Sequence, residues 1–542
     1  MIKRIAALVL ALILPAVLLY SCSGNKEPEV EAAFMYPIDE MPGCLDPTIA
    51  DTLAERTVIA NCMEGLVRMD SEGNIQPGVA QTVQISDDGK TYEFHLRTNA
   101  KWHVFSGEDS YFPPGFDNRI TAHDFVFSLR RALDPEMDCP DAERFYAIQN
   151  AQAVHSGALS SDQLGVRAAD DYTLVIELEK AADDFLSLLT LSAAMPCNEQ
   201  FFNSTSGRYG LELELTLYNG PYYLSKWNQD GDTLIIRKNA DYIGETQAAS
   251  SGITLKADPD EESRYENLSD GTYDAAVLGA ESTARIRERT KMTVQKTENI
   301  VWGLCVNTQD ALLSNLNLRL ALFSAVDLSQ LTIPEQMAAP AYGVIPSSCR
   351  SGSSSYRDTA GQADGISYHA DTARNYWNQA KAELKKDSVS LKLLCTKEYE
   401  TLMKKLIQNC QSVFGIAVSI GLESVDQKDF DARLSSGDYQ LAFAPVKAET
   451  ASPADFLAQF RSGSGGNFFR YQSEIYDDLA SQAMAGAGTA VLRRAESHLI
   501  QNGVMYPFYT QATSFVQAKN VSGIYTSAVD STPVFIAAQR SK

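Results

Sequence analysis

The sequence is poor in basic residues for its size, and this shortage excludes a large class of functions. Among its 542 residues, 46 are Lys or Arg and 69 are Asp or Glu, which gives a net charge of −23 at pH 7. Proteins that bind nucleic acids need clustered Lys and Arg side chains to contact the phosphates. We therefore expect no nucleic-acid partner, and the acidic balance favours cationic ligands instead.

Motifs of enzymatic and metal chemistry are also missing. The chain has no G-x-S-x-G elbow, no H-E-x-x-H and no P-loop, and its six His residues are scattered singly. No two of its nine Cys residues form a C-x-x-C pair, so neither a zinc site nor a disulfide framework is indicated. We predict a protein that is not an enzyme and that uses no metal or cofactor.

Long apolar runs are absent except at the N-terminus. Two basic residues precede an apolar stretch at residues 5–19, which is too short for a permanent membrane span and is typical of an export signal. Residues 19–22 read LYSC and resemble the lipobox of bacterial lipoproteins, in which the Cys is lipidated. We predict a lipoprotein signal peptide at residues 1–21, lipidation of Cys22 and a tether at residues 22–34. The alternative is a plain signal peptide.

The rest of the chain shows alternating strand and helix patterns. Residues 79–97 alternate apolar and polar side chains around Asp88-Gly89, which is typical of a hairpin. Residues 118–135 change to a helical period, and Thr121-x-x-Asp124 has the spacing of a capping box.

Similar patterns continue through the second half of the sequence. Residues 389–394 indicate one strand, and residues 413–422 indicate another that is entered through Gly415. This alternation favours an α/β fold with mixed sheets. At roughly 150 residues per domain, the length predicts three or four domain-sized units.

A series of short motifs follows one order along the chain. The motifs are LDP at 45–47, EGL at 64–66, GNIQPGVA at 73–80, TAHDFVFSLRR at 121–131, NGPY at 219–222, GTYD at 271–274 and RLAL at 319–322. Over residues 36–525 this ordered set resembles the extracytoplasmic solute-binding proteins of peptide ABC transporters, the dipeptide and oligopeptide class of family 5 type.

The resemblance implies a large, two-lobed fold like that of the class II periplasmic binding proteins, with an extra domain inserted in the N-terminal lobe. The chain would cross between the lobes twice. The implied segments are lobe I at residues 35–54, 189–296 and 510–542, the inserted small domain at 55–188, and lobe II at 297–509.

The resemblance also implies a function. Such proteins capture an extended peptide in the interlobe cleft through backbone hydrogen bonds, close on it and deliver it to an ABC permease complex. We expect a monomer held by a lipid anchor on the extracytoplasmic face of the cell membrane, or in the periplasm. The alternatives are the same fold binding a nickel complex, haem or an oligosaccharide, a sensor or adhesion lipoprotein, and an exported hydrolase.

The main candidate for a ligand site follows the predicted strand at residues 438–443. Many peptide binders read W-x-A-D-Y-x-D-P here, and their first Asp pairs with the α-ammonium of the peptide. Residues 446–453 of this chain read VKAETASP, so the resemblance places Glu449 on that Asp, after Val446, Lys447 and Ala448. A buried carboxylate needs a paired charge, which a ligand ammonium would supply; the alternative is a solvated loop residue.

Other residues are candidates through the same resemblance. Phe443 stands where some oligopeptide binders carry an Arg for the ligand carboxylate. Cys44 belongs to residues 42–45, which correspond to the first ligand-facing strand of the family. Trp302 matches pocket aromatics or a core Trp, and Asn467 matches a cleft Asn. The expanded loop at residues 103–118 suggests a packed excursion that modifies partner contact.

Overall fold

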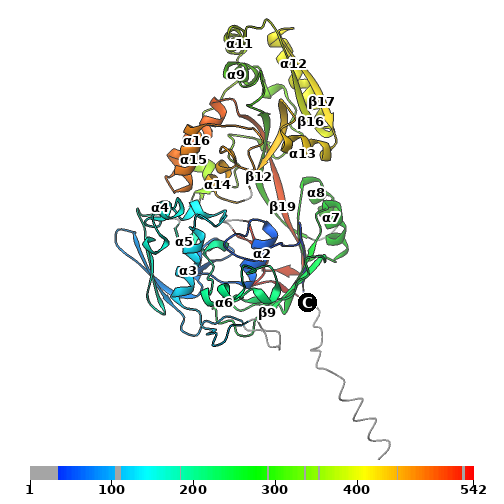
Figure 1. Cartoon of the computed structure of the whole chain (residues 1–542). Coiled ribbons are helices and arrows are strands. Elements are labelled where there is room, and N and C mark those ends of the chain that lie inside the picture. The colour runs from blue at the N-terminus through cyan, green and yellow to red at the C-terminus, as the bar shows by residue number, and fades with distance from the viewer. Residues whose placement is uncertain are drawn as a thin grey trace, which may run out of the picture.

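The computed structural model describes residues 34–103, 112–182, 185–289, 292–334, 337–351, 354–448, 450–527 and 531–541. Figure 1 shows a lower body, built from the blue to green part of the chain, and an upper body, built from the green to orange part. The strands β12 (Met292–Val306) and β19 (Met505–Ala518) run from one body into the other. We call these bodies the lower and the upper lobe.

The lower lobe contains a four-stranded sheet in the order β1-β10-β9-β8. Strand β1 pairs with β10 in parallel, whereas the other pairs are antiparallel. The strands are β1 (Phe34–Ile38), β8 (Tyr222–Lys226), β9 (Thr233–Lys238) and β10 (Gly252–Ala257). Helix α2 (Leu53–Cys62) contributes Val58, Ile59 and Cys62 to the same core, which also receives Phe515 and Phe535 from the C-terminal part of the chain.

A second core of the lower lobe surrounds an antiparallel sheet in the order β4-β5-β7-β6. The strands are β4 (Ala80–Ile85), β5 (Thr91–Leu96), β6 (Val166–Asp170) and β7 (Thr173–Glu177). Strands β4 and β5 confirm the predicted hairpin, and Gly89 in its turn has φ +68°, a conformation that favours glycine.

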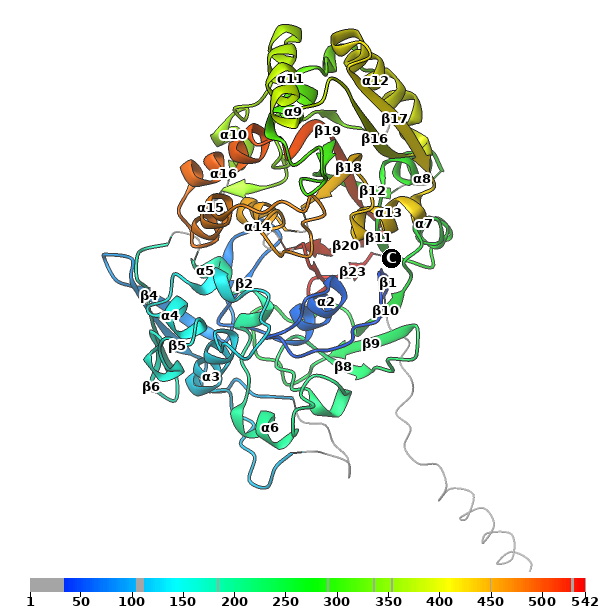
Figure 2. The same cartoon turned by 45° about the horizontal axis from the view of Figure 1, so that its top comes forward.

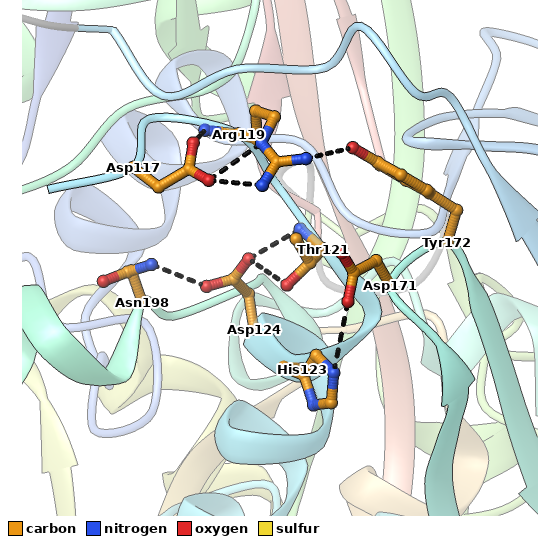
Figure 3. Close-up of polar contacts among 8 residues, drawn as sticks. All are labelled: Asp117, Arg119, Thr121, His123, Asp124, Asp171, Tyr172 and Asn198. Carbon is orange, nitrogen blue, oxygen red and sulfur yellow. Dashed lines mark hydrogen bonds and ion pairs between the residues drawn. The ribbon is translucent and has the colours of Figure 1, made fainter.

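Helix α3 (Ala122–Ala132) packs on this sheet and confirms the helix predicted after Thr121. The Asp124 carboxylate accepts the backbone N–H of Thr121 at 2.7 Å, as the capping-box spacing predicts, and also accepts the side-chain amide of Asn198 at 2.9 Å. Figure 3 shows Asp124 between these two donors. Burial raises the pKa of Asp124 to about 6.

A mixed seven-stranded sheet in the order β11-β19-β12-β18-β16-β17, with β13 also pairing with β19, forms the centre of the upper lobe and extends through β12 and β19 to β11, which packs against β1 of the lower lobe. Strand β16 pairs in parallel with both β17 and β18. The strands besides β12 and β19 are β11 (Ala275–Leu278), β13 (Ala339–Pro340), β16 (Val389–Thr396), β17 (Val418–Val425) and β18 (Leu441–Lys447). Strand β16 confirms the strand predicted at residues 389–394.

Helices enclose the upper sheet, as Figure 2 shows. They are α9 (Leu316–Ser324), α11 (Ala370–Leu384), α12 (Glu400–Phe414), α13 (Gln427–Ser436), α14 (Pro453–Ala458), α15 (Glu474–Met484) and α16 (Thr489–Gln501). Val413 was predicted in a strand but lies in α12, and the strand begins only at Val418. The helix ends at Phe414, two residues into the predicted strand, and is followed by Gly415, whose φ of +60° favours glycine.

Separate hydrophobic clusters fill the lobes. The lower lobe has one cluster around β1 and one around α3, and the upper lobe has one on each face of its large sheet. The eight cysteines between Cys44 and Cys410 are free thiols. Among the described residues, none of the helices is long and apolar enough to cross a bilayer. The residue limits given above for the lobes stay a prediction.

Candidate functional site

The crossover strand β12 is irregular where the chain passes between the lobes. Its pairing with β19 shifts register between Thr297 and Ile300, and again between Trp302 and Gly303. The carboxylate of Glu298, which lies within the first of these register shifts, accepts the Ser347 hydroxyl at 3.0 Å. A β-bulge bends a strand and frees groups from the ladder for other partners.

The loop that carries the main candidate site is bound to this bulge. The backbone N–H of Ala448 donates to the carbonyl oxygen of Asn299 at 2.7 Å. Ala448 and Val446 are buried in the core of the upper lobe, whereas Lys447 is exposed. Glu449 lies outside the described residues.

An aromatic cluster lies beside the same strands. The rings of Trp302 and Phe443 are 5.2 Å apart between centroids, and Tyr399 lies 4.7 Å from Trp302. The indole N–H of Trp302 donates to the side chain of Gln511 at 2.7 Å. Burial and the nearby Glu398 carboxyl raise the pKa of Tyr399. The structure thus brings Trp302 and Phe443 together, with Phe443 fully buried and Trp302 8% exposed.

The residues that follow Glu449 form a hydrogen-bonded turn. The Thr450 hydroxyl donates to the Asp455 carboxylate at 2.7 Å, and Ser452 caps α14 by accepting the N–H of Asp455 at 3.2 Å. Ser452 stands where the family pattern has its second Asp, and a hydroxyl can cap a helix as a carboxylate does.

Residues 42–45 do not form the ligand-facing strand expected of them. Strand β1 ends at Ile38, and the chain around Cys44 is irregular. The N–H of Cys44 donates to the Glu55 carboxylate at 3.0 Å, and that of Leu45 donates to the carbonyl of Gly210 at 2.7 Å. Both N–H groups therefore have partners within the chain. The Glu55 side chain that caps α2 also binds the loop that precedes this helix.

Asn467 shapes a turn with both ends of its amide. Its Nδ2 donates to the carbonyls of Arg461 at 2.8 Å and Tyr471 at 2.7 Å, and its Oδ1 accepts the N–H of Tyr471 at 3.1 Å. The side chain is 8% exposed. A ligand would have to compete with these internal hydrogen bonds.

Two other predictions fall partly or wholly outside the described residues. Cys22 and the core of the expanded loop, residues 104–111, lie outside them. The end of that loop is described: Phe112 and Phe116 pack on Phe201, with ring centroids 5.6 and 6.1 Å away.

Charged side chains of the two lobes also meet beside this site, and sequence patterns did not indicate them. Arg461 forms an ion pair with Glu143 at 2.6 Å, and Arg144 contacts Asp455 at 3.3 Å. The partners of each pair lie more than 300 residues apart in the chain, so no local spacing could reveal them.

Comparison with known proteins identifies the family. The model described as "Bacterial extracellular solute-binding proteins, family 5 Middle" matches residues 74–468. The chain belongs to this family. The resemblance found in the ordered motifs is therefore confirmed.

Relatives of this family 5 protein align with it over nearly its whole length. The oligopeptide-binding protein OppA of Bacillus subtilis strain 168 is 25% identical in an alignment of 521 positions that covers 92% of this chain and 91% of that protein. A dipeptide-binding protein of Lactococcus lactis subsp. cremoris strain MG1363 is 24% identical in an alignment of 547 positions that covers 96% of each chain.

A solved structure confirms the fold class. The substrate-binding domain of an oligopeptide ABC transporter from Bacillus anthracis strain Ames superposes with a TM-score of 0.71 at 25% identity, over 94% of this chain and 98% of that chain. The predicted two-lobed α/β architecture of the periplasmic-binding-protein type is thus correct.

Proposed function

We propose that this family 5 protein is the substrate-binding lipoprotein of a peptide ABC importer. It captures peptides between its lobes on the extracytoplasmic side, and presents them to a membrane permease. It acts by reversible binding and lobe closure, as a monomer, without covalent chemistry. The supporting observation is that relatives covering more than nine-tenths of both chains are an oligopeptide-binding and a dipeptide-binding protein.

The proposed ligand position uses the loop after β18. Glu449 would pair with the α-ammonium of the peptide, and Ala448 and Lys447 would flank it. The anchoring of this loop to the bulge at Asn299 supports the proposal, because strand bending at the crossover would then move the loop. Trp302, backed by Phe443, would form the apolar floor beside it.

The segment limits follow from the same proposal. Lobe I comprises residues 35–54, 189–296 and 510–542, the small domain residues 55–188, and lobe II residues 297–509. Residues 1–21 are the signal peptide, and Cys22 carries the lipid that holds the protein to the membrane.

Native mass spectrometry tests the proposal directly. The mature chain, with Cys22→Ala to avoid lipidation, would be weighed as purified and again after denaturation and refolding. We expect a heterogeneous peptide mass that is lost on refolding, and calorimetry should then show binding of a mixed pool of short peptides. An empty protein that ignores the pool would overturn the peptide assignment and favour another solute or a role outside transport.

The ammonium anchor is tested separately with Glu449→Gln. Loss of the carboxylate that would pair with the peptide ammonium should weaken peptide binding about tenfold or more, and N-acetylated peptides should bind the original and the variant equally. The control is Glu474→Gln, an exposed carboxylate at the start of α15 in the same lobe. Equal affinity of all three proteins for free-amine peptides would exclude the anchor while leaving peptide capture intact.

A further inference from the structure

Two ion pairs join side chains that belong to different lobes. Glu143 and Arg144 lie in the short helix η1 (Ala142–Phe145), whose apolar residues belong to the α3 core of the lower lobe. Their partners, Asp455 in α14 and Arg461 just after it, lie beside Phe456, Leu457 and Phe460 of the upper-lobe core. Both views show α14 and α15 at the face of the upper lobe that is turned toward the lower lobe (Figures 1 and 2).

The pairs are short and partly shielded from water. The Arg461 guanidinium lies 2.6 Å from the Glu143 carboxylate, and the side chains are 29% and 27% exposed. Arg144 is only 8% exposed and lies 3.3 Å from both Asp455 of the upper lobe and Asp141 of its own lobe. Charges in such surroundings attract more strongly than in bulk water, and each costs free energy if left without a partner.

The upper-lobe partners are fixed by the segments that carry the proposed ligand site. Asp455 accepts the hydroxyl of Thr450, the residue next to Glu449, at 2.7 Å. Arg461 is held through its backbone carbonyl by the Asn467 side chain at 2.8 Å. The ion pair between Arg144 of the lower lobe and Asp455 is therefore connected to the loop beside Glu449 through the Asp455 carboxylate and the Thr450 hydroxyl.

We propose that these pairs form an interlobe latch: Arg461–Glu143 and Arg144–Asp455 hold the lobes together, and Arg144 positions the ligand loop through Asp455. Arg144 can reach Asp455 only when the lobes meet, so loop geometry and lobe closure depend on each other. The effect on ligand release rests on the proposed function, whereas the latch itself does not. Weakening it should open the ligand-free protein and speed the release of bound peptide.

Charge reversal tests the latch without any ligand. Small-angle X-ray scattering of the mature Cys22→Ala chain would compare Glu143→Arg, Arg461→Glu and the double reversal. We expect each single reversal to increase the radius of gyration, because like charges then face each other, and the double reversal to restore it. Arg208→Glu is the matched control, since its partner Glu212 lies in the same lobe at 3.0 Å, and it should leave the radius unchanged.

Kinetics test the positioning role. In stopped-flow experiments, Arg144→Gln should release peptide about tenfold faster, the size expected of one interacting pair, while Arg208→Gln should not. Near-ultraviolet circular dichroism checks that each variant is folded. If a charge-reversal variant does not fold, the variants Glu143→Gln and Arg461→Gln are measured in its place. Unchanged radii for both single reversals, or no restoration in the double, would overturn the latch. If the charge reversals change the radius of gyration as expected but the protein binds no peptide, the latch is supported and the proposed peptide function is refuted.

Discussion

Glu64 is a buried acidic residue whose protonation makes the stability of the folded chain depend on pH. Its side chain is 7% exposed in the lower lobe, and its carboxylate accepts the hydroxyl of Tyr242. Burial raises the pKa of Glu64 to about 7, and the opposing effects of Tyr242, Arg68 and Arg97 are smaller. The folded chain therefore binds a proton here at a pH where the unfolded chain has lost it.

This proton makes the stability of the lower lobe depend on pH. A raised pKa in the folded state means that stability is full below the ordinary pKa of 4.5 and is lost as the pH rises through about 7. The shift corresponds to about 3 kcal/mol of unfolding free energy. Glu64→Gln keeps an acceptor for Tyr242 without titrating, so in urea unfolding the variant should gain relative to the original between pH 5 and pH 8.

The comparison has a matched control at the surface. Glu72→Gln replaces an exposed carboxyl in the neighbouring hairpin, and it should follow the original protein at each pH. Other groups titrate in both proteins and cancel from the difference. A stability difference between Glu64→Gln and the original that is the same at pH 5 and pH 8 would contradict the assignment.

At the scale of elements, the start of α3 combines a local and a distant contact. Asp124 accepts the N–H of Thr121, three residues before it, and the amide of Asn198 from a later loop. Asp124→Ala removes both acceptors and leaves the Asn198 amide without this partner. We expect a loss of about 2 kcal/mol in unfolding free energy, which combines the lost cap with the lost partner of the half-buried Asn198 amide.

Thermal unfolding measures this loss of stability. The control variant changes another carboxylate beside the same end of α3. Asp171→Ala removes an exposed carboxylate that lies 3.7 Å from the His123 ring. Figure 3 shows this pair beside the start of α3. A solvent-exposed pair contributes little to stability, so this variant should melt as the original does. Equal melting of both variants would show that Asp124 does not anchor the helix.

At the scale of the whole molecule, the proposed lipid decides where the protein resides. With Cys22→Ala, the full chain expressed in a bacterial host should move from the membrane fraction to the soluble fraction, and labelling with a radioactive fatty acid should be lost. Cys44→Ala is the control, because it removes a free thiol within the folded lower lobe. A Cys22→Ala chain that still sediments with membranes would contradict the lipid anchor.

Sequence patterns predicted those helices and strands that depend on residues close together in the chain. The hairpin β4–β5, the helix α3 and the strand β16 each follow from spacing within about twenty residues. Residues 42–45 do not form the expected strand because the N–H groups of Cys44 and Leu45 donate to Glu55 and Gly210, and the second of these lies far along the chain. No alternation of apolar residues encodes such a partner.

Ordered motifs and hydrophobic periodicity were enough to predict the family and the α/β class, because neither signal needs knowledge of spatial neighbours. The export signal at residues 1–21 stays a prediction. The tertiary structure was needed to show that the rings of Trp302 and Phe443 lie side by side at a tilt, that the Asn467 amide bonds to its own turn, and that Arg461 pairs with Glu143. The first and the last of these contacts join segments that lie far apart in the chain. Their energies depend on burial and on distances of a few ångströms, which the order of residues along the chain does not specify.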